Sequence, residues 1–357
     1  MKKTLFVPFS ILTAIFMTLN ILAFGSELDS LVGRPFKDFS TTAFCSYSSY
    51  HPSQYLTDNN WDILCAFLTP GTTAKLDSLG VSHSKSQLRL LEVGDLLLFE
   101  KGVYHTKMPI FGSTQTQNIR KESKEFADSI FPLIEPDIKD LIAEFSDRGY
   151  ATQNYSLIFS YLLDGYIWGD DKLISPSEMT EHGTWSGAYW AMYNNRAQDK
   201  IGTNEYGTVN VNWSGELGYW PGDKLLIKFA NCIGENQLVI ENEDIKVTLE
   251  KWNLVDKEGH VSVPVIYSGN GDKIDNLCDK ITKVIAEAVK KHCISFANEY
   301  HIGSQEEAEV IFYHEVMWDL LSILEDTHLI EKPAILKGEE VGKEHFKDIT
   351  FIVISNE

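Results

Sequence analysis

The chain has few basic residues beside its acidic ones, few cysteines, and no long apolar run beyond its N-terminus. Its 357 residues include 31 Lys and Arg against 51 Asp and Glu, which gives a formal net charge of −20. Nucleic acids and anionic membranes attract basic surfaces, so this balance argues against general binding to either. The hydrophobic fraction of 43% excludes a wholly disordered chain and predicts a folded protein.

The motifs of common cofactor sites are also missing. The chain has no G-x-G-x-x-G, P-loop, EF-hand loop, G-x-S-x-G or C2H2 pattern. Nucleotide binding, EF-hand calcium binding and α/β-hydrolase chemistry therefore lose support. We predict no cofactor and no metal ion.

Cysteine is scarce, and its spacing excludes two further classes. The five cysteines include no C-x-x-C pair, so zinc-ribbon and thioredoxin-type motifs are absent. Cys278 and Cys293 lie on one predicted helix at a separation of roughly 22 Å, which is too far for a disulfide. Cys45 with Cys65 is the one pairing that we consider. The alternative is that most cysteines are small buried apolar residues.

The N-terminus carries the clearest signal that is present. Lys2 and Lys3 precede an uncharged, mostly apolar stretch over residues 4–24, and Ala23-Phe24-Gly25 then provides small residues for cleavage. This order is typical of a bacterial secretory signal peptide over residues 1–25, and it predicts an exported protein of the periplasm or cell envelope. The alternative is an uncleaved segment that attaches the protein to the membrane through residues 4–24.

The sequence after a Ser- and Tyr-rich lead-in over residues 26–57 predicts three short helices and a hairpin. Apolar spacing predicts helices over residues 61–68, 72–79 and 82–94, the last capped by Ser82. The run LLLFEKGVYHTKMPIF then predicts two strands joined by a turn. With L-x-x-L-G-V-S at the second turn, residues 58–111 resemble a winged helix-turn-helix domain.

The winged-helix resemblance implies DNA binding, but the rest of the chain favours another use. An exported and acidic protein meets no chromosome, and a fold does not fix a function. We therefore expect the module to serve structure or protein binding. The alternative is a membrane-tethered DNA-binding regulator that uses the local excess of basic residues between Ser82 and Lys124.

The middle of the chain predicts further helices, and the C-terminal half mixes strands with helices. Pro132 and Pro136 predict that residues 118–149 form two helices, and residues 154–169 predict a buried core helix. Two helices are predicted over residues 272–300 and 305–329. Six strands are predicted at TVNVNW, KLLIKFA, QLVIE, DIKVTLEKW, HVSVPVIY and DITFIVIS.

These elements together predict an α+β fold with two domains after the signal peptide. A winged-helix-like module with a helical middle occupies residues 58–171. A mainly antiparallel sheet packed with C-terminal helices occupies residues 172–357.

The segment from residue 183 to residue 196 is dense in aromatic side chains. Aromatic rings beside amides and a guanidinium hold sugars and peptide side chains through apolar faces and hydrogen bonds. We therefore predict a site here for a small molecule, a carbohydrate or a partner protein, and a non-catalytic binding function. The predicted ligand-binding residues are Trp185, Tyr189, Trp190, Tyr193, Asn194 and Arg196. The alternative is a core helix whose polar tips reach water.

Two acidic patterns are candidates for chemistry. Glu178, Glu181 and His182 are spaced to share one side of a helix, and a carboxylate beside a histidine can hold a metal or transfer protons. Glu181 and His182 are therefore the candidate catalytic residues of an alternative function, a metal-assisted or acid–base hydrolase. Glu315 and Asp319, four residues apart, predict a solvated acidic face on the penultimate helix.

Overall fold

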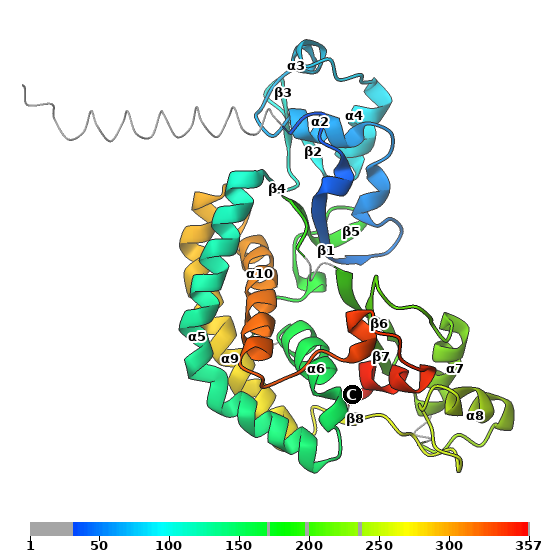
Figure 1. The fold of residues 1–357 in the computed structure, drawn as a ribbon. Helices are drawn as coiled ribbons and strands as arrows, with labels where there is room; N and C mark the ends of the chain where they lie inside the picture. The colour runs from blue at the N-terminus through cyan, green and yellow to red at the C-terminus, as the bar shows by residue number, and fades with distance from the viewer. Residues whose placement is uncertain (1–30, 170–171, 197–199, 235–237, 356–357) are drawn as a thin grey trace, which may run out of the picture. The chain divides into compact units, whose positions relative to one another are not determined.

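The computed structural model describes residues 31–169, 172–196, 200–234 and 238–355. With about 52% helix and 18% strand in separate small sheets, the fold is α+β, as predicted (Figure 1). The predicted signal peptide, residues 1–25, lies outside the described residues. Among the described residues no helix combines the length and the apolar character needed to cross a membrane.

The chain forms two compact units whose segments alternate along the sequence. The first unit contains the described residues up to Asn118, with Ser175–Asn195 and Ala297–Ala308. The second unit contains Ile119–Ile174, Arg196–Phe296 and the residues from Glu309 onward. This arrangement differs from the single boundary at residue 171 that the change in sequence texture suggested.

The first unit is built on a long antiparallel strand pair. Strands β1 (Phe39–Tyr47) and β5 (Trp185–Tyr193) pair along their whole length, and β4 (Ile110–Phe111) adds to β5 in parallel. The segment around Trp185 is thus a strand, which corrects the alternative of a core helix. Its aromatic and β-branched neighbours on β1 favour the extended form.

The predicted helices and hairpin of the first unit are present in the expected order. They are α2 (Asn60–Ala66), α3 (Thr73–Ser78), α4 (Lys85–Val93), β2 (Leu97–Glu100) and β3 (Val103–Thr106). Ser84 rather than Ser82 caps α4, because its hydroxyl accepts a hydrogen bond from the Gln87 amide at 3.2 Å. Short 3₁₀ turns occupy Phe36–Asp38, Pro52–Tyr55 and Pro176–Glu178.

Most of the residues of three long helices belong to the second unit, where the helices lie side by side (Figure 1). They are α5 (Ser113–Asp147), α9 (Lys273–Glu299) and α10 (Gln305–Asp326), of which the last two were predicted. The prediction of a break at Pro132 and Pro136 was wrong, because α5 continues through both. Both prolines lie on its exposed side, while Ile134 and Ile138 are fully buried on the other. Burial of that apolar face outweighs the local cost of the prolines.

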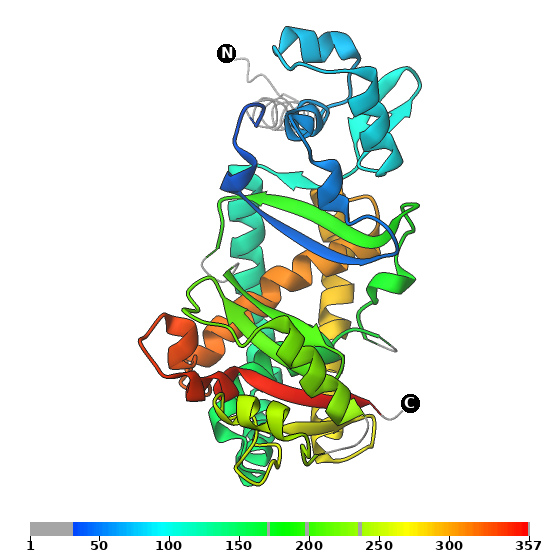
Figure 2. The same ribbon diagram turned by 90° about the vertical axis from the view of Figure 1, so that its right-hand side faces the viewer.

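A four-stranded sheet and an unusual helix complete the second unit (Figure 2). The strand order is β6 (Ile201–Tyr206), β7 (Val209–Ser214), β9 (Thr350–Ser355) and β8 (Val265–Ser268). Only β8 and β9 are parallel. After α6 (Asn154–Ser156), residues Leu157–Tyr166 form a π-helix, and further 3₁₀ turns occupy Ala151–Gln153, Ala334–Lys337 and Lys343–Ile349.

Three of the predicted strands were wrong. KLLIKFA belongs to helix α7 (Asp223–Gly234), and DIKVTLEKW to α8 (Glu243–Glu250). QLVIE contributes no more than an isolated bridge at Val239 among its described residues. In α7 the buried residues recur at helical spacing, which a short apolar run does not reveal by itself. They are Leu226, Phe229, Ala230 and Ile233.

Cys45 and Cys65 have free thiols, so they are not paired with each other. Desolvation by burial raises the pKa of the Cys45 thiol to about 12. Burial also raises the pKa of Cys65, which belongs to the core of the first unit. These cysteines therefore pack as small apolar residues.

Candidate functional site

A cavity of about 450 Å³ lies within the first unit, and we call it the His182 cavity. Its walls come from the α4–β2 turn, the β2–β3 hairpin and the residues that follow it, the loop before β5, β5 itself, and the segment that enters α10. The lining side chains with polar or aromatic groups include Asp95, His105, Lys107, His182, Trp185, Tyr189, His301 and Glu307. Met108 and Met179 contribute apolar side chains to the cavity wall.

Strand β5 presents alternate residues to this cavity. Trp185, Gly187 and Tyr189 line it, whereas Ala188 and Trp190 are buried on the opposite face, because successive side chains of a strand point to opposite sides. Gly187 has a φ of +122°, and a Cβ there would come within 2.1 Å of the Phe44 carbonyl oxygen. The close approach of β1 and β5 beside the cavity therefore requires glycine.

His182 is fixed by contacts on several sides. Its Nδ1 lies 2.6 Å from Asp95 Oδ2, and its Nε2 lies 3.3 Å from the Gly187 carbonyl oxygen. The ring stacks on Trp185 with centroids 3.9 Å apart, and the Trp185 indole donates to the Gly94 carbonyl at 3.0 Å. Both ring nitrogens of His182 therefore lie near oxygen atoms of the protein.

Asp95 joins His182 to Lys107. Asp95 has a left-handed backbone φ of 55°, which aspartate tolerates better than most residues. Lys107 Nζ lies 2.5 Å from Asp95 Oδ2. Partial burial alone would raise the pKa of Asp95. Hydrogen bonds from His182 and Lys107 outweigh burial, so the pKa of this carboxyl is lowered.

Glu307 lies in the first turn of α10 and lines the same cavity. The Ser304 hydroxyl caps this turn by accepting a hydrogen bond from the Glu307 amide at 3.1 Å. Desolvation raises the pKa of the Glu307 carboxyl to about 7, against the opposing effects of His182, the Gly303 backbone and Lys107. The cavity thus contains a carboxyl that changes charge near neutral pH.

The structure brings three of the predicted site residues together at the cavity: His182, Trp185 and Tyr189. Glu181 does not join them, because it pairs with Ser186 and lines a separate shallow hollow. The expectation that Glu178, Glu181 and His182 share one helical side was wrong. Glu178 ends a 3₁₀ turn and closes a capping box with Ser175.

The other predicted ligand-binding residues of the first unit lie away from the cavity. Trp190 is buried on the far face of β5. Tyr193 packs edge-on against Phe39 at 5.3 Å and accepts a hydrogen bond from Arg34 at 3.2 Å. Asn194 is exposed and left-handed, with a φ of 67°, directly after β5. None of the three lines the cavity.

Arg196 belongs to the second unit, where carboxylates hold it. Its Nη1 lies 2.6 Å from Glu315 Oε2, and its Nη2 lies 2.6 Å from Asp319 Oδ1. Arg120 adds a contact to Glu315 at 3.2 Å, and the Ser123 hydroxyl donates to Asp319 at 2.5 Å. Glu315 and Asp319 are buried, so the prediction of a solvated acidic face was wrong. Buried carboxylates need such partners.

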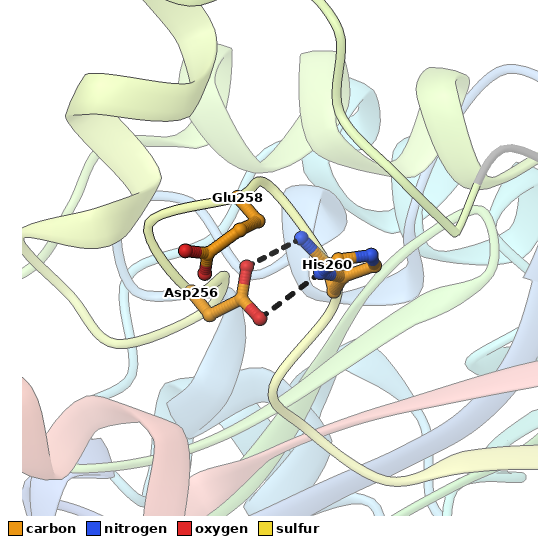
Figure 3. A group of neighbouring side chains, drawn as sticks. All are labelled: Asp256, Glu258 and His260. Carbon is orange, nitrogen blue, oxygen red and sulfur yellow. Dashed lines mark hydrogen bonds and ion pairs between the residues drawn. The ribbon is translucent and has the colours of Figure 1, made fainter.

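An exposed cluster in the second unit has the residue types of a metal site (Figure 3). The ligand atoms of Asp256, Glu258 and His260 lie within 4.8 Å of one another. Asp256 accepts hydrogen bonds from the His260 amide at 2.8 Å and from its ring at 3.1 Å. These bonds stabilise the turn by themselves, so the arrangement requires no ion.

Asp95, Lys107 and Glu307 are the site residues that the sequence analysis missed. They come from three separate parts of the chain, and no motif connects them to His182. Comparison with protein-family models, with curated proteins and with solved structures found no match. The geometry of the site is therefore the basis for a functional proposal.

Proposed function

We propose that the chain binds a small organic ligand in the His182 cavity without transforming it, and that it does so as an exported protein of the cell envelope. The observation that carries the proposal is the division of roles among the charged groups. His182 and Asp95 satisfy each other and their neighbours, whereas the Glu307 carboxyl lines the cavity in a partly desolvated position.

The engagement of His182 argues against acid–base catalysis by this residue. A general base needs a ring nitrogen within hydrogen-bond reach of the substrate. Both nitrogens of His182 already face acceptors of the protein, and the ring lies flat on Trp185. These contacts favour a positioning role, in which His182 holds the loop before β5 against Asp95.

The lining indicates the chemistry of the ligand. Met108, Met179 and Trp185 offer apolar surface, and a carboxyl such as Glu307 binds hydrogen-bond donors. A molecule with an apolar body and one amine or hydroxyl group matches this combination. The cavity volume of about 450 Å³ falls in the range of small-molecule sites.

The experiment is a calorimetric titration of the mature protein with aromatic and aliphatic amines and with the matching alcohols. At least one of these probes binds the wild type and remains chemically unchanged. Glu307→Gln weakens that binding about tenfold, because the amide is a poorer acceptor than the carboxylate. Glu306→Gln is the matched control, since Glu306 is exposed and does not line the cavity.

Equal binding by Glu307→Gln and the wild type would contradict the proposed site. Conversion of a probe would instead favour the second candidate, an acid–base hydrolase. The observation behind that candidate is the raised pKa of Glu307, which suits a proton donor near neutral pH. In that case Glu307 rather than Glu181 would transfer the proton.

The export part of the proposal rests on residues 1–25, whose signal-peptide pattern motivates it. The intact mass of the native protein from fractionated cells tests it. We expect a chain that starts at Ser26 in the periplasmic fraction. A full-length chain in the membrane fraction would make residues 4–24 an anchor. A full-length soluble cytoplasmic chain would overturn export and favour the DNA-binding alternative.

A further inference from the structure

A second cavity, of about 490 Å³, lies within the second unit, and we call it the Asn210 cavity. The π-helix forms one side of the cavity through Tyr161 and Tyr166. Trp168 and Lys172, which come after the π-helix in the sequence, also line the cavity. The sheet forms the other side through Asn210 of β7 and alternate residues of β9. Figure 1 shows α6, which leads into the π-helix, beside this sheet. None of these residues belongs to the His182 cavity.

Asn210 is the feature of this cavity that points to a ligand. It lies in an inner strand of the sheet and is 9% exposed, yet its side-chain amide has no hydrogen-bond partner among the described residues. Asn212, two residues further on the same face, donates to the Thr203 hydroxyl at 3.1 Å and to the Gly202 carbonyl at 3.4 Å. Because Asn210 lines the cavity, its amide donor and acceptor are available to a molecule bound there.

The aromatic side chains of the cavity contact one another and neighbouring side chains. In a π-helix the hydrogen bonds join residues five apart, so Tyr161 and Tyr166 fall on the same side, and their rings meet edge-on at 5.5 Å. The Lys172 ammonium lies 3.6 Å from the centre of the Tyr166 ring. Trp168 stacks against His314 with centroids 5.5 Å apart. A π-helix is rare, and it frequently marks a functional site.

The charges of the cavity exclude an anionic ligand. Of the described residues that line it, Lys172 is the one cation, and its ammonium is paired with Asp279 at 3.0 Å. Glu205 contributes a negative charge, and Ser268 and Ser355 add hydroxyls. A phosphate or carboxylate therefore meets no unpaired positive group. A neutral ligand with many donors and acceptors matches an amide, hydroxyls and a carboxylate.

We propose that the Asn210 cavity is a binding site for a neutral sugar of one or two rings. Sugar rings place an apolar face on aromatic side chains and direct their hydroxyls to amides and carboxylates, which is the combination found here. The volume suits a ligand of this size. The inference is independent of the His182 cavity, because it uses other residues of another unit.

The test is a calorimetric and saturation-transfer NMR titration of the full mature chain with glucose, N-acetylglucosamine, maltose and cellobiose. Phenylalanine and adenine serve as non-sugar probes. At least one of the sugars binds, and Asn210→Ala weakens this binding about tenfold through the loss of the amide hydrogen bonds. The absence of binding by all four sugars, or preferential binding of a non-sugar probe, would overturn the proposal.

A stability measurement distinguishes a ligand-binding amide from a structural one. Asn210→Ala removes an amide without a partner, so the melting temperature of the ligand-free protein stays the same or rises. Asn212→Ala is the matched control, and it lowers the melting temperature because its partners lose their hydrogen bonds. An equal decrease in both variants shows that Asn210 is structural and contradicts the proposal, as does unchanged sugar binding by Asn210→Ala.

Discussion

The two units contain charged clusters of the same kind in different surroundings. In the second unit Arg196 lies between Glu315 and Asp319, and no side chain of the three is more than 12% exposed. In the first unit His182 and Lys107 meet at Asp95, which is 28% exposed beside a cavity. The sealed cluster serves structure because its members satisfy one another. The cluster at the cavity shapes a wall that a ligand can reach.

The largest expected effect comes from opening the sealed cluster. Arg196→Ala leaves two buried carboxylates without their main partner, and we expect the free energy of unfolding to fall by about 3–5 kcal/mol. Urea denaturation measures this change. Arg89→Ala is the control, because Arg89 pairs with Glu92 at 3.0 Å on the surface and contributes at most about 1 kcal/mol. Equal losses would show that burial does not separate the two kinds of pair.

A smaller and pH-dependent effect is expected at the cavity. The lowered pKa of Asp95 means that its stabilising contribution is complete above the ordinary value of 3.8 and is lost as the pH falls through the lower folded value. Asp95→Asn therefore costs about 1.5–3 kcal/mol near neutral pH. The difference from the wild type shrinks in acid. Denaturation curves across this pH range measure it.

The control for Asp95→Asn is Asp77→Asn, because the Asp77 side chain is 73% exposed and makes one distant contact with His83 at 3.9 Å. This control variant changes stability by at most about 0.5 kcal/mol. A deficit of Asp95→Asn that stays constant from neutral to acidic pH would contradict a role for the ionised carboxylate.

The smallest effect on stability is expected at Glu307, where the substitution raises the stability instead of lowering it. Because the folded protein holds this proton up to a pKa of about 7, the wild type loses stability as the pH rises from the ordinary value of 4.5 to 7. Glu307→Gln lacks this loss and gains on the order of 1 kcal/mol relative to the wild type at pH 8. Thermal melts measure the difference, and Glu306→Gln shows none.

The elements that the sequence predicted correctly have long or local patterns. Helices α9 and α10 repeat apolar residues over many turns, and the last strand is a continuous apolar run. KLLIKFA is ambiguous because a short apolar run suits a strand and a helix equally. The prediction of a helix break at Pro132 and Pro136 was wrong because their positions on the exposed side of α5 depend on tertiary packing.

The candidate site was predictable only where its residues are neighbours in the sequence. His182, Trp185 and Tyr189 lie within one segment, and their residue types drew attention to it. Asp95 and Glu307 come from distant segments, and only the fold brings them to the same cavity. Arg196 looked like part of the aromatic segment, but the carboxylates that hold it are on α10. A single sequence does not encode these pairings in any local pattern.

The buried thiols have a consequence for the compartment that we propose. Disulfide exchange requires a thiolate, and burial keeps Cys45, Cys65 and Cys293 protonated at neutral pH. In an oxidising environment the folded chain therefore offers these sulfurs neither to glutathione-like disulfides nor to oxidoreductases. For an exported chain, the stage open to oxidation would be the interval between translocation and folding, before burial desolvates these thiols.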